Sequence, residues 1–291
     1  MQAINILDFD GSITAQHELL ATFKTRIMIS NLRKFQYAAR LWTSPKKFSA
    51  ICEASINDLS HGFTLLGSGD FHHFSLGLIA RYRMQLTVVL FDNHPDWIKP
   101  PHQYHCGTWV YSLARLPHVA RIIIVGLQSG DINGSEFNKG DVESYLNKKI
   151  ILLPYQDVEI SLDGKAVILH SKLSQNLETG IAEIIENIST QQVYISIDKD
   201  CLRLEDAYTN WEQGTLPIAK VTSAIRAIQN KFDIVGADIV GDYSAPTFRS
   251  PLKWIGSWLD RKVSNTPSNQ FLLKRNELTN IALLQALSGA T

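Results

Sequence analysis

The chain has 291 residues, 45% of them hydrophobic, which is enough for a core of ordinary size and argues against disorder. Lys and Arg total 28 and so do Asp and Glu, and this zero formal charge excludes bulk electrostatic attraction to nucleic acid or to an anionic membrane. No stretch reaches the roughly 18 to 20 apolar residues of a membrane helix, and the N-terminus MQAINILDFD lacks the features of a signal peptide. We therefore expect a cytoplasmic protein. Its three cysteines, Cys52, Cys106 and Cys201, are widely spaced and are expected to be thiols in or near the core.

Short apolar runs rich in Val, Ile and Leu alternate with segments of helical periodicity along the chain. The runs predict buried strands at Ile4 to Phe9, Phe63 to Leu66, Leu86 to Phe91, Arg121 to Val125, Ile150 to Leu153, Val193 to Ile197 and Phe232 to Ile234. The helical segments are Phe74 to Arg83, Thr108 to Leu116, Leu173 to Ile188 and Ile218 to Lys231. This alternation predicts an α/β fold, a three-layer α/β/α arrangement around a mostly parallel sheet. Without a convincing linker, residues 1–291 are predicted to form one domain, with loops at Gly126 to Asp141 and at Asn265 to Asn269 before a final helix.

The first polar motif is LLGSGDFHHFS, in which a strand and a Gly-rich turn precede the adjacent histidines His72 and His73. A histidine pair alone is more often a loop feature than a ligand pair. Its significance depends on the two motifs that follow.

The segment VVLFDNHPDW places Asp92, His94 and Asp96 after an apolar strand. Side chains at i, i+2 and i+4 of an extended chain point to one side, and the carboxyl ends of parallel strands are where ligands bind. The two carboxylates repel each other unless a cation lies between them. Carboxylate oxygens together with one imidazole are a ligand set that suits Mn²⁺.

The segment VYISIDKDC adds Asp198 and Asp200 on one face after another apolar run. Together the two segments supply four aspartates and one histidine. That is about the number of ligands that two bridged divalent ions need from a protein before waters and one more histidine are added.

These residues resemble the ureohydrolase superfamily, the arginases and agmatinases, over roughly Leu65 to Pro246. The family pattern is Gly-Gly-Asp-His, then Asp-x-His-x-Asp, then Ser-x-Asp-x-Asp. The last two are close matches here, whereas GSGDFHHFS is looser, so that either His72 or His73 fits as ligand, with a slight preference for His73. The resemblance implies an arginase-like fold and two Mn²⁺ ions bridged by Asp92 and Asp198, and we count Asp96 among the catalytic residues as well as the ligands.

The resemblance also assigns two roles outside the metal ligands. His105 in YHCGTW stands where the family has a mobile, proton-shuttling histidine. The family glutamate that grips the guanidinium corresponds to Gly241 in GADIVGDYSAP, so the neighbouring Asp242 becomes the candidate substrate anchor.

Within the superfamily, GSGDFHHFS, TNWEQG and ILDFDGSIT are most similar to the peptide arginases. Those enzymes convert arginine residues of ribosomally made precursor peptides to ornithine, a post-translational modification in natural product biosynthesis that releases urea. The expected partner is then an arginine-containing peptide. Ureohydrolases are often oligomers, so a homo-oligomer also fits, although no segment identifies an interface.

Three other interpretations compete with this one. The first is hydrolysis of free arginine or agmatine. The second is a deacetylase-like site with one zinc ion, or a metal-binding scaffold without turnover, on the same fold. The third is a phosphatase, since ILDFDGSIT resembles an Asp-x-Asp-Gly-Thr nucleophile motif with Asp8 and Asp10, although no downstream motifs of that class follow in order.

Overall fold

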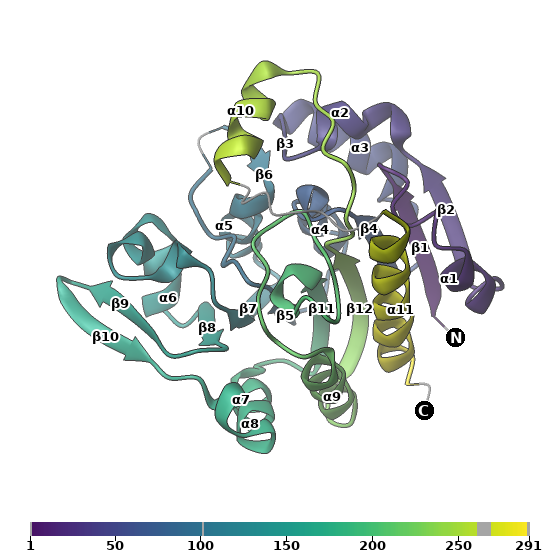
Figure 1. Ribbon diagram of the computed structural model, residues 1–291. Helices are drawn as coiled ribbons and strands as arrows, with labels where there is room; N and C mark the ends of the chain where they lie inside the picture. Colours follow the sequence, from purple (N-terminus) through teal and green to yellow (C-terminus); the bar gives the residue numbers. More distant parts are fainter. Residues whose placement is uncertain (1, 101, 261–268, 290–291) are drawn as a thin grey trace.

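An eight-stranded parallel sheet lies at the centre of the molecule (Figure 1). Its strands have the spatial order β2-β1-β4-β12-β11-β5-β7-β8. They are β1 (Ala3–Asp8), β2 (Ile27–Asn31), β4 (Gly62–Gly67), β5 (Leu86–Phe91), β7 (Val119–Leu127), β8 (Ile150–Pro154), β11 (Gln192–Asp198) and β12 (Asp233–Val240). The structure is a computed structural model that describes residues 2–100, 102–260 and 269–289.

Helices cover both faces of this sheet, which gives three layers (Figure 1). They are α1 (His17–Thr22), α2 (Gln36–Ala39), α3 (Pro45–Ser55), α4 (Phe74–Ile79), α5 (Trp109–Leu113), α6 (Val142–Leu146), α7 (Lys172–Gln175), α8 (Leu177–Asn187), α9 (Ile218–Gln229), α10 (Pro251–Asp260) and α11 (Asn269–Leu287). Two small antiparallel pairs accompany them, β3 (Trp42–Thr43) with β6 (Tyr104–His105), and β9 (Val158–Leu162) with β10 (Lys165–Leu169).

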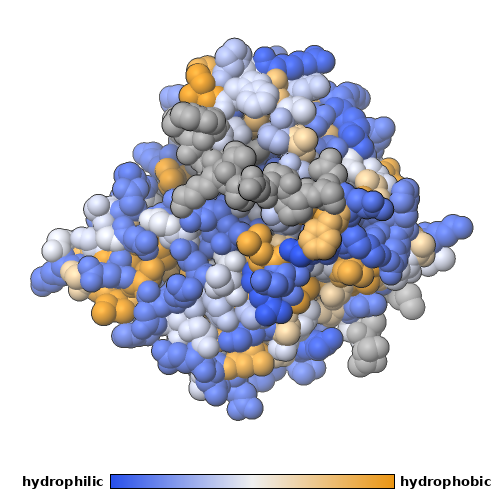
Figure 2. Space-filling view, viewed as in Figure 1, coloured by the Kyte–Doolittle hydropathy of each residue, from blue (hydrophilic) through white to orange (hydrophobic). Residues whose placement is uncertain are grey.

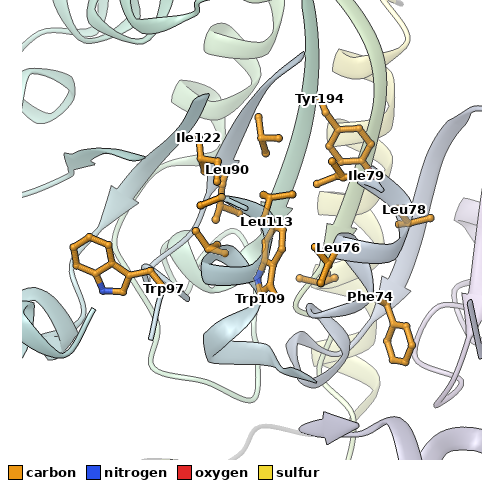
Figure 3. Close-up of a cluster of buried hydrophobic side chains, with 14 of the residues drawn as sticks. Phe74, Leu76, Leu78, Ile79, Leu90, Trp97, Trp109, Leu113, Ile122 and Tyr194 are labelled. Carbon is orange, nitrogen blue, oxygen red and sulfur yellow. The ribbon is translucent and has the colours of Figure 1, made fainter. Parts of the chain in front are cut away.

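Side-chain alternation along the strands builds a separate core on each face of the sheet. In β5, Val88 and Leu90 belong to the core that α3, α4 and α5 cover, whereas Val89 and Phe91 belong to the core that α1, α8, α9 and α11 cover. Figure 3 shows the first core, where Trp109 and Leu113 of α5 lie beside Leu90 and Ile122 of the strands. Because both faces are buried, the strands are nearly continuous apolar runs.

The predicted α/β/α fold with a mostly parallel sheet is confirmed. All seven predicted strands are present, although β12 extends to Val240, well beyond the predicted end at Ile234. The helix predicted from Leu173 to Ile188 is two helices, because Asn176 leaves the helical conformation and caps α8 through Thr179 N–H. The predicted break at 265–269 lies outside the described residues except for Asn269, where α11 begins.

The order of the strands reverses beside β5. From β5 the chain continues outward through β7 and β8, and it then returns to place β11 on the other side of β5. In open parallel sheets, the crevice outside the carboxyl ends of the strands at such a reversal is the usual ligand site. The residues that follow β5 and β11 are those of the two Asp motifs, so the topology alone brings them together.

Much of the molecular surface in the view of Figure 1 is hydrophilic (Figure 2). Apolar side chains gather near the β9–β10 hairpin, where Val167 and Ile168 are exposed. Cys52, Cys106 and Cys201 are buried thiols, as predicted. Among the described helices, none combines the length and the apolar character needed to cross a lipid bilayer.

Candidate metal centre and active site

Tight turns at the ends of β4, β5 and β11 carry the candidate ligands. Behind β5 the backbone bends, and Asp96 adopts a left-handed conformation with φ of 49°. Behind β11, Asp198 caps the 3-10 turn η6 (Lys199–Cys201) by accepting a hydrogen bond from Asp200 N–H at 3.0 Å. The extended backbone expected for both motifs is therefore replaced by turns, which still direct the carboxylates into one place. A non-glycine residue in the left-handed region is locally strained, and such strain is concentrated at functional sites.

The side chains form two ligand groups that share one aspartate. His72 Nδ1 lies 3.4 Å from Asp92 Oδ2, 3.3 Å from Asp96 Oδ2 and 3.5 Å from Asp198 Oδ2. His94 Nδ1 lies 3.0 Å from Asp200 Oδ2 and 3.8 Å from Asp92 Oδ1. The ligand atoms of His72, Asp92 and Asp96, and likewise those of Asp92, His94 and Asp200, all lie within 4.8 Å of one another. The two oxygens of Asp92 thus face different groups, Oδ2 the group of His72 and Oδ1 the group of His94.

The electrostatics of this cluster favour a cation. Burial, followed by the charges of Asp96 and Asp200, raises the pKa of Asp92 well above its usual range. Burial and the charge of Asp200 raise the pKa of Asp198 to about 8. Burial would lower the pKa of His94, but the charge and hydrogen bond of Asp200 outweigh it and raise the value to about 10. Without cations the carboxylates therefore retain protons that a bound metal ion would displace.

Of the buried side-chain atoms that lack hydrogen-bond partners within the described residues, two belong to these ligand groups. They are His72 Nδ1 and Asp92 Oδ2, both on residues that are 1% exposed. A buried imidazole nitrogen and carboxylate oxygen that face each other without a hydrogen bond are costly unless an ion lies between them. The donor set of carboxylate oxygens with two imidazoles suits hard divalent ions such as Mn²⁺. The residues present therefore fit a pair of such ions.

Hydroxyl and indole groups behind the cluster orient its ligands. His72 Nε2 lies 3.0 Å from Ser196 Oγ, which donates to Asp238 Oδ1 at 2.8 Å. Trp109 Nε1 donates to Asp96 Oδ2 at 2.8 Å. We did not predict this orienting role for Ser196, Asp238 or Trp109. The signal that could have revealed them is the polar pair Ser196 and Asp238 inside otherwise apolar strands.

The histidine pair is divided between two environments. His72 points into the cluster, whereas His73 Nε2 lies 2.9 Å from Thr43 Oγ1 and its ring packs beside Phe48 and Phe74. Burial lowers the pKa of His73 well below the ordinary value, so that this ring is neutral. The preference for His73 as ligand thus conflicts with the geometry, in which the turn η2 (Gly69–Phe71) aims His72 at the aspartates.

His105 lines the same cavity as the cluster. The β3–β6 pairing sets it opposite Trp42, and the two rings stack with centroids 5.9 Å apart. Gly107 N–H donates to His105 Nδ1 at 2.9 Å, which leaves Nε2 as the proton-bearing nitrogen of the neutral ring. Burial lowers the pKa of His105 to about 4.

The predicted substrate anchor, Asp242, lies in a different environment. It is 1% exposed, and its carboxylate accepts hydrogen bonds from Gln16, Asn280 and Lys199, the last an ion pair with Nζ at 2.7 Å from Oδ2. Among the described residues, those that line the cavity do not include Asp242. The geometry therefore contradicts its role as an anchor, because its oxygens are occupied behind the site.

Asp8 and Asp10 of the phosphatase-like motif shape an N-terminal turn. Asp8 Oδ1 accepts from Gly11 N–H at 2.8 Å, and its Oδ2 lies 2.9 Å from Arg33 Nε. Asp10 accepts from Ser12 Oγ at 2.7 Å and pairs with the buried Arg40 at 3.2 Å. Both carboxylates are thus engaged by local donors and arginines, as in a structural turn.

The candidate ligands border a cavity of about 660 Å³. Its lining includes Trp42, His105 and Trp211 beside the cluster. This volume is in the range of small-molecule and side-chain binding sites. The cluster, the fitting donor set and the cavity at the reversal of strand order define the class of the protein as an α/β protein with a candidate divalent-metal site in an open cavity.

Comparison with known proteins places the chain within that class. The arginase family profile matches residues 39–244, more than half of the chain, so the chain belongs to the arginase family. An uncharacterised protein of Thermotoga maritima is 26% identical over 239 residues, which cover 82% of this chain and 79% of that protein. The predicted membership of the arginase and ureohydrolase superfamily is confirmed.

Solved structures agree in fold at low sequence identity. The chain resembles an arginase from Bacillus subtilis with a TM-score of 0.62 and 13% identity, covering 100% of this chain and 99% of that one. It also resembles an agmatine ureohydrolase from Thermoplasma volcanium with a TM-score of 0.59 and 14% identity, covering 99% of this chain and 89% of the other.

Proposed function

We propose that this protein is a binuclear-metal hydrolase that converts arginine residues of a precursor peptide to ornithine and releases urea. The observation that carries the proposal is the pair of ligand groups around Asp92 that border a cavity. One ion would be held by His72, Asp92, Asp96 and Asp198, and the other by Asp92, His94, Asp198 and Asp200, with Asp92 and Asp198 as bridges. Such ions, manganese by the donor chemistry, would supply hydroxide at neutral pH by lowering the pKa of water.

The reaction adds water across one C–N bond of the guanidinium. A guanidinium cation and water give an alkylammonium ion and urea, so that the total charge stays at one positive unit. The departing nitrogen must gain a proton. His105 lines the cavity, and we assign it this proton transfer: its ring takes up the proton that the attacking water releases, and the resulting imidazolium gives a proton to the departing nitrogen and returns to the neutral form.

A peptide substrate is supported by sequence similarity and by the character of the cavity. The segments GSGDFHHFS, TNWEQG and ILDFDGSIT are similar to peptide arginases. The cavity wall includes Trp42, Ile98 and Trp211, which offer apolar contact to a polypeptide. Free arginine and agmatine remain the competing substrates within the same family.

The test offers manganese-loaded protein an arginine-containing peptide, free arginine and agmatine in parallel, and measures urea. We expect the peptide alone to lose CH₂N₂ by mass spectrometry. Asp92→Asn should abolish the reaction, whereas Asp233→Asn, an exposed carboxylate at the start of β12, should not. Urea from a small molecule alone would overturn the peptide assignment, and no urea from any compound would overturn the proposed reaction.

A further inference from the structure

The short strand pair β3–β6 carries His105, to which we assign the proton transfer. Trp42 of β3 pairs with His105 of β6, and their rings stack with centroids 5.9 Å apart and planes at 23°. So short a pair cannot hold its own geometry, because even a longer isolated hairpin is only marginally stable in water. Other contacts must therefore fix the ring, and a misplacement of about 1 Å at an active site can cost roughly 100-fold in rate.

The backbone that leads into this pair is strained at Leu41, which lies between the end of α2 and the start of β3. Leu41 is buried and has a φ of 71°, in the left-handed region that residues with a Cβ rarely adopt. Its N–H donates to Asp70 O at 3.0 Å, and its carbonyl oxygen accepts from Cys106 N–H at 3.1 Å. A strained bend of this kind persists only where its surroundings hold it.

Lys253 of α10 supplies such support, and Figure 1 shows α10 beside β3 and β6. Its Nζ donates to Arg40 O at 2.6 Å and to Trp42 O at 2.7 Å, the carbonyl groups on either side of Leu41. Two further carbonyl groups accept from it at 3.1 Å, those of Tyr37 and Ala38. Burial lowers the pKa of Lys253 to about 8, so the ammonium stays charged at neutral pH. Because hydrogen bonds from a charged donor are the stronger ones, this side chain joins the end of α2, the bend and β3 into one unit.

The same ammonium lies against the ring that stacks on His105. Lys253 Nζ is 5.4 Å from the centroid of the Trp42 ring, within the range of a cation–π contact. Its charge also acts on His105: burial lowers the pKa of that imidazole to about 4, the charge of Asp70 opposes this shift, and the charge of Lys253 adds to it. The contacts thus run from α10 to the imidazole through both the backbone and the ring of Trp42.

We infer that Lys253 is a positioning residue, which holds the His105 ring at the cavity by anchoring the Leu41 bend and the Trp42 ring. This inference rests on the proposed function, because the proton transfer by His105 belongs to that reaction. It extends the working parts of the site to α10, since Lys253 is not among the described residues that line the cavity.

The kinetic test compares Lys253→Met with Lys220→Met in the manganese-loaded enzyme. Lys220 of α9 is a matched control, because its Nζ donates to Leu173 O at 2.6 Å and lies 5.1 Å from the centroid of the Tyr155 ring. In Lys253→Met, kcat for an arginine-containing peptide should fall about 10- to 100-fold while KM changes less than about threefold. Lys220→Met should change neither constant. An unchanged kcat in Lys253→Met, or a defect confined to KM, would overturn the positioning role.

Two further variants separate position from other causes. In a His105→Asn background, Lys253→Met should lower kcat by less than about twofold, because a residue that acts through His105 then has nothing to position. A loss of full size in that background would contradict the inference. Lys253→Gln removes the charge but keeps two N–H donors, so it should retain more activity than Lys253→Met and less than the wild type. Equal losses in the two variants would assign the effect to the charge, and an unchanged Lys253→Gln would refute positioning even if Lys253→Met does not fold.

A spectroscopic measurement separates this inference from the proposed reaction. Histidine ring signals of the metal-free protein are recorded by NMR at neutral pH, and His105→Asn identifies the signal of His105. Its Hε1 signal should move in Lys253→Met toward its position in Trp42→Leu, which removes the stacked ring, and should stay in place in Lys220→Met. That movement in a wild type that releases no urea would support the positioning and overturn the reaction. Urea release together with an unmoved signal would overturn the positioning alone.

Discussion

The ion pair behind the site should govern stability and not substrate affinity. Lys199 is 0% exposed and its Nζ lies 2.7 Å from Asp242 Oδ2 and 2.9 Å from Asn280 Oδ1. Burial lowers the pKa of Lys199 and raises that of Asp242, so each charge depends on the other. Removing one partner of such a pair costs about 3 to 5 kcal/mol. Asp242→Asn should therefore lower the free energy of unfolding by about that amount, a large share of the roughly 5 to 15 kcal/mol of a typical domain.

Chemical denaturation of the metal-free protein, monitored by circular dichroism, measures this loss. The matched control is Glu136→Gln, which breaks the exposed pair with Lys139 and should leave the midpoint almost unchanged. The double variant Lys199→Met/Asp242→Leu should recover much of the stability, because it removes both charges from the interior. A stable Asp242→Asn whose only defect is a raised KM would refute this reasoning and restore Asp242 as the substrate anchor.

Three further predictions concern the metal cluster. His72→Asn should lose at least one manganese ion per chain, whereas His73→Asn should keep both, as measured by metal analysis after dialysis. Gly241→Glu should weaken manganese binding without improving KM, because its Cβ would collide with Asp198; tighter substrate binding would contradict this. The metal-free protein should lose stability as pH rises from about 4 to about 8, by up to about 1.4 kcal/mol per pH unit for one carboxyl group. The reason is that the pKa of Asp198 is raised to about 8 in the fold, so the folded state binds more protons in that window; saturating manganese should remove the slope in denaturation series.

Strands that are buried on both faces could be predicted because they are continuous apolar runs. The prediction of Leu86 to Phe91 coincides with β5, and both faces of that strand are buried. The strand β2 was missed because it lies at the sheet edge, where Met28 and Ile29 are exposed. The hairpin β9–β10 was missed because its strands are mostly exposed or half-buried, and their burial follows no strict alternation.

The choice between adjacent or alternative ligands could not be made from the sequence. His72 and His73 have the same chemistry, and only the turn at Gly69–Phe71 decides which ring meets the aspartates. Asp242 is a plausible anchor by spacing, but its partners Gln16 and Asn280 come from opposite ends of the chain. Contacts across 226 residues, as between Gln16 and Asp242, or across 38, as between Asp242 and Asn280, leave no local signature in one sequence.

The residues between the ligands of each motif explain why two short loops can form one rigid site. Asn93, between Asp92 and His94, donates through N–H to Asp200 and through Nδ2 to the Glu212 carbonyl, so it joins the loops behind β5 and β11. Lys199, between Asp198 and Asp200, points the other way and ties η6 to α11 and to the end of β12. The ligands face the cavity while these intervening side chains anchor their turns. Changes at Asn93 or Lys199 should therefore alter metal affinity although neither belongs to the ligand groups.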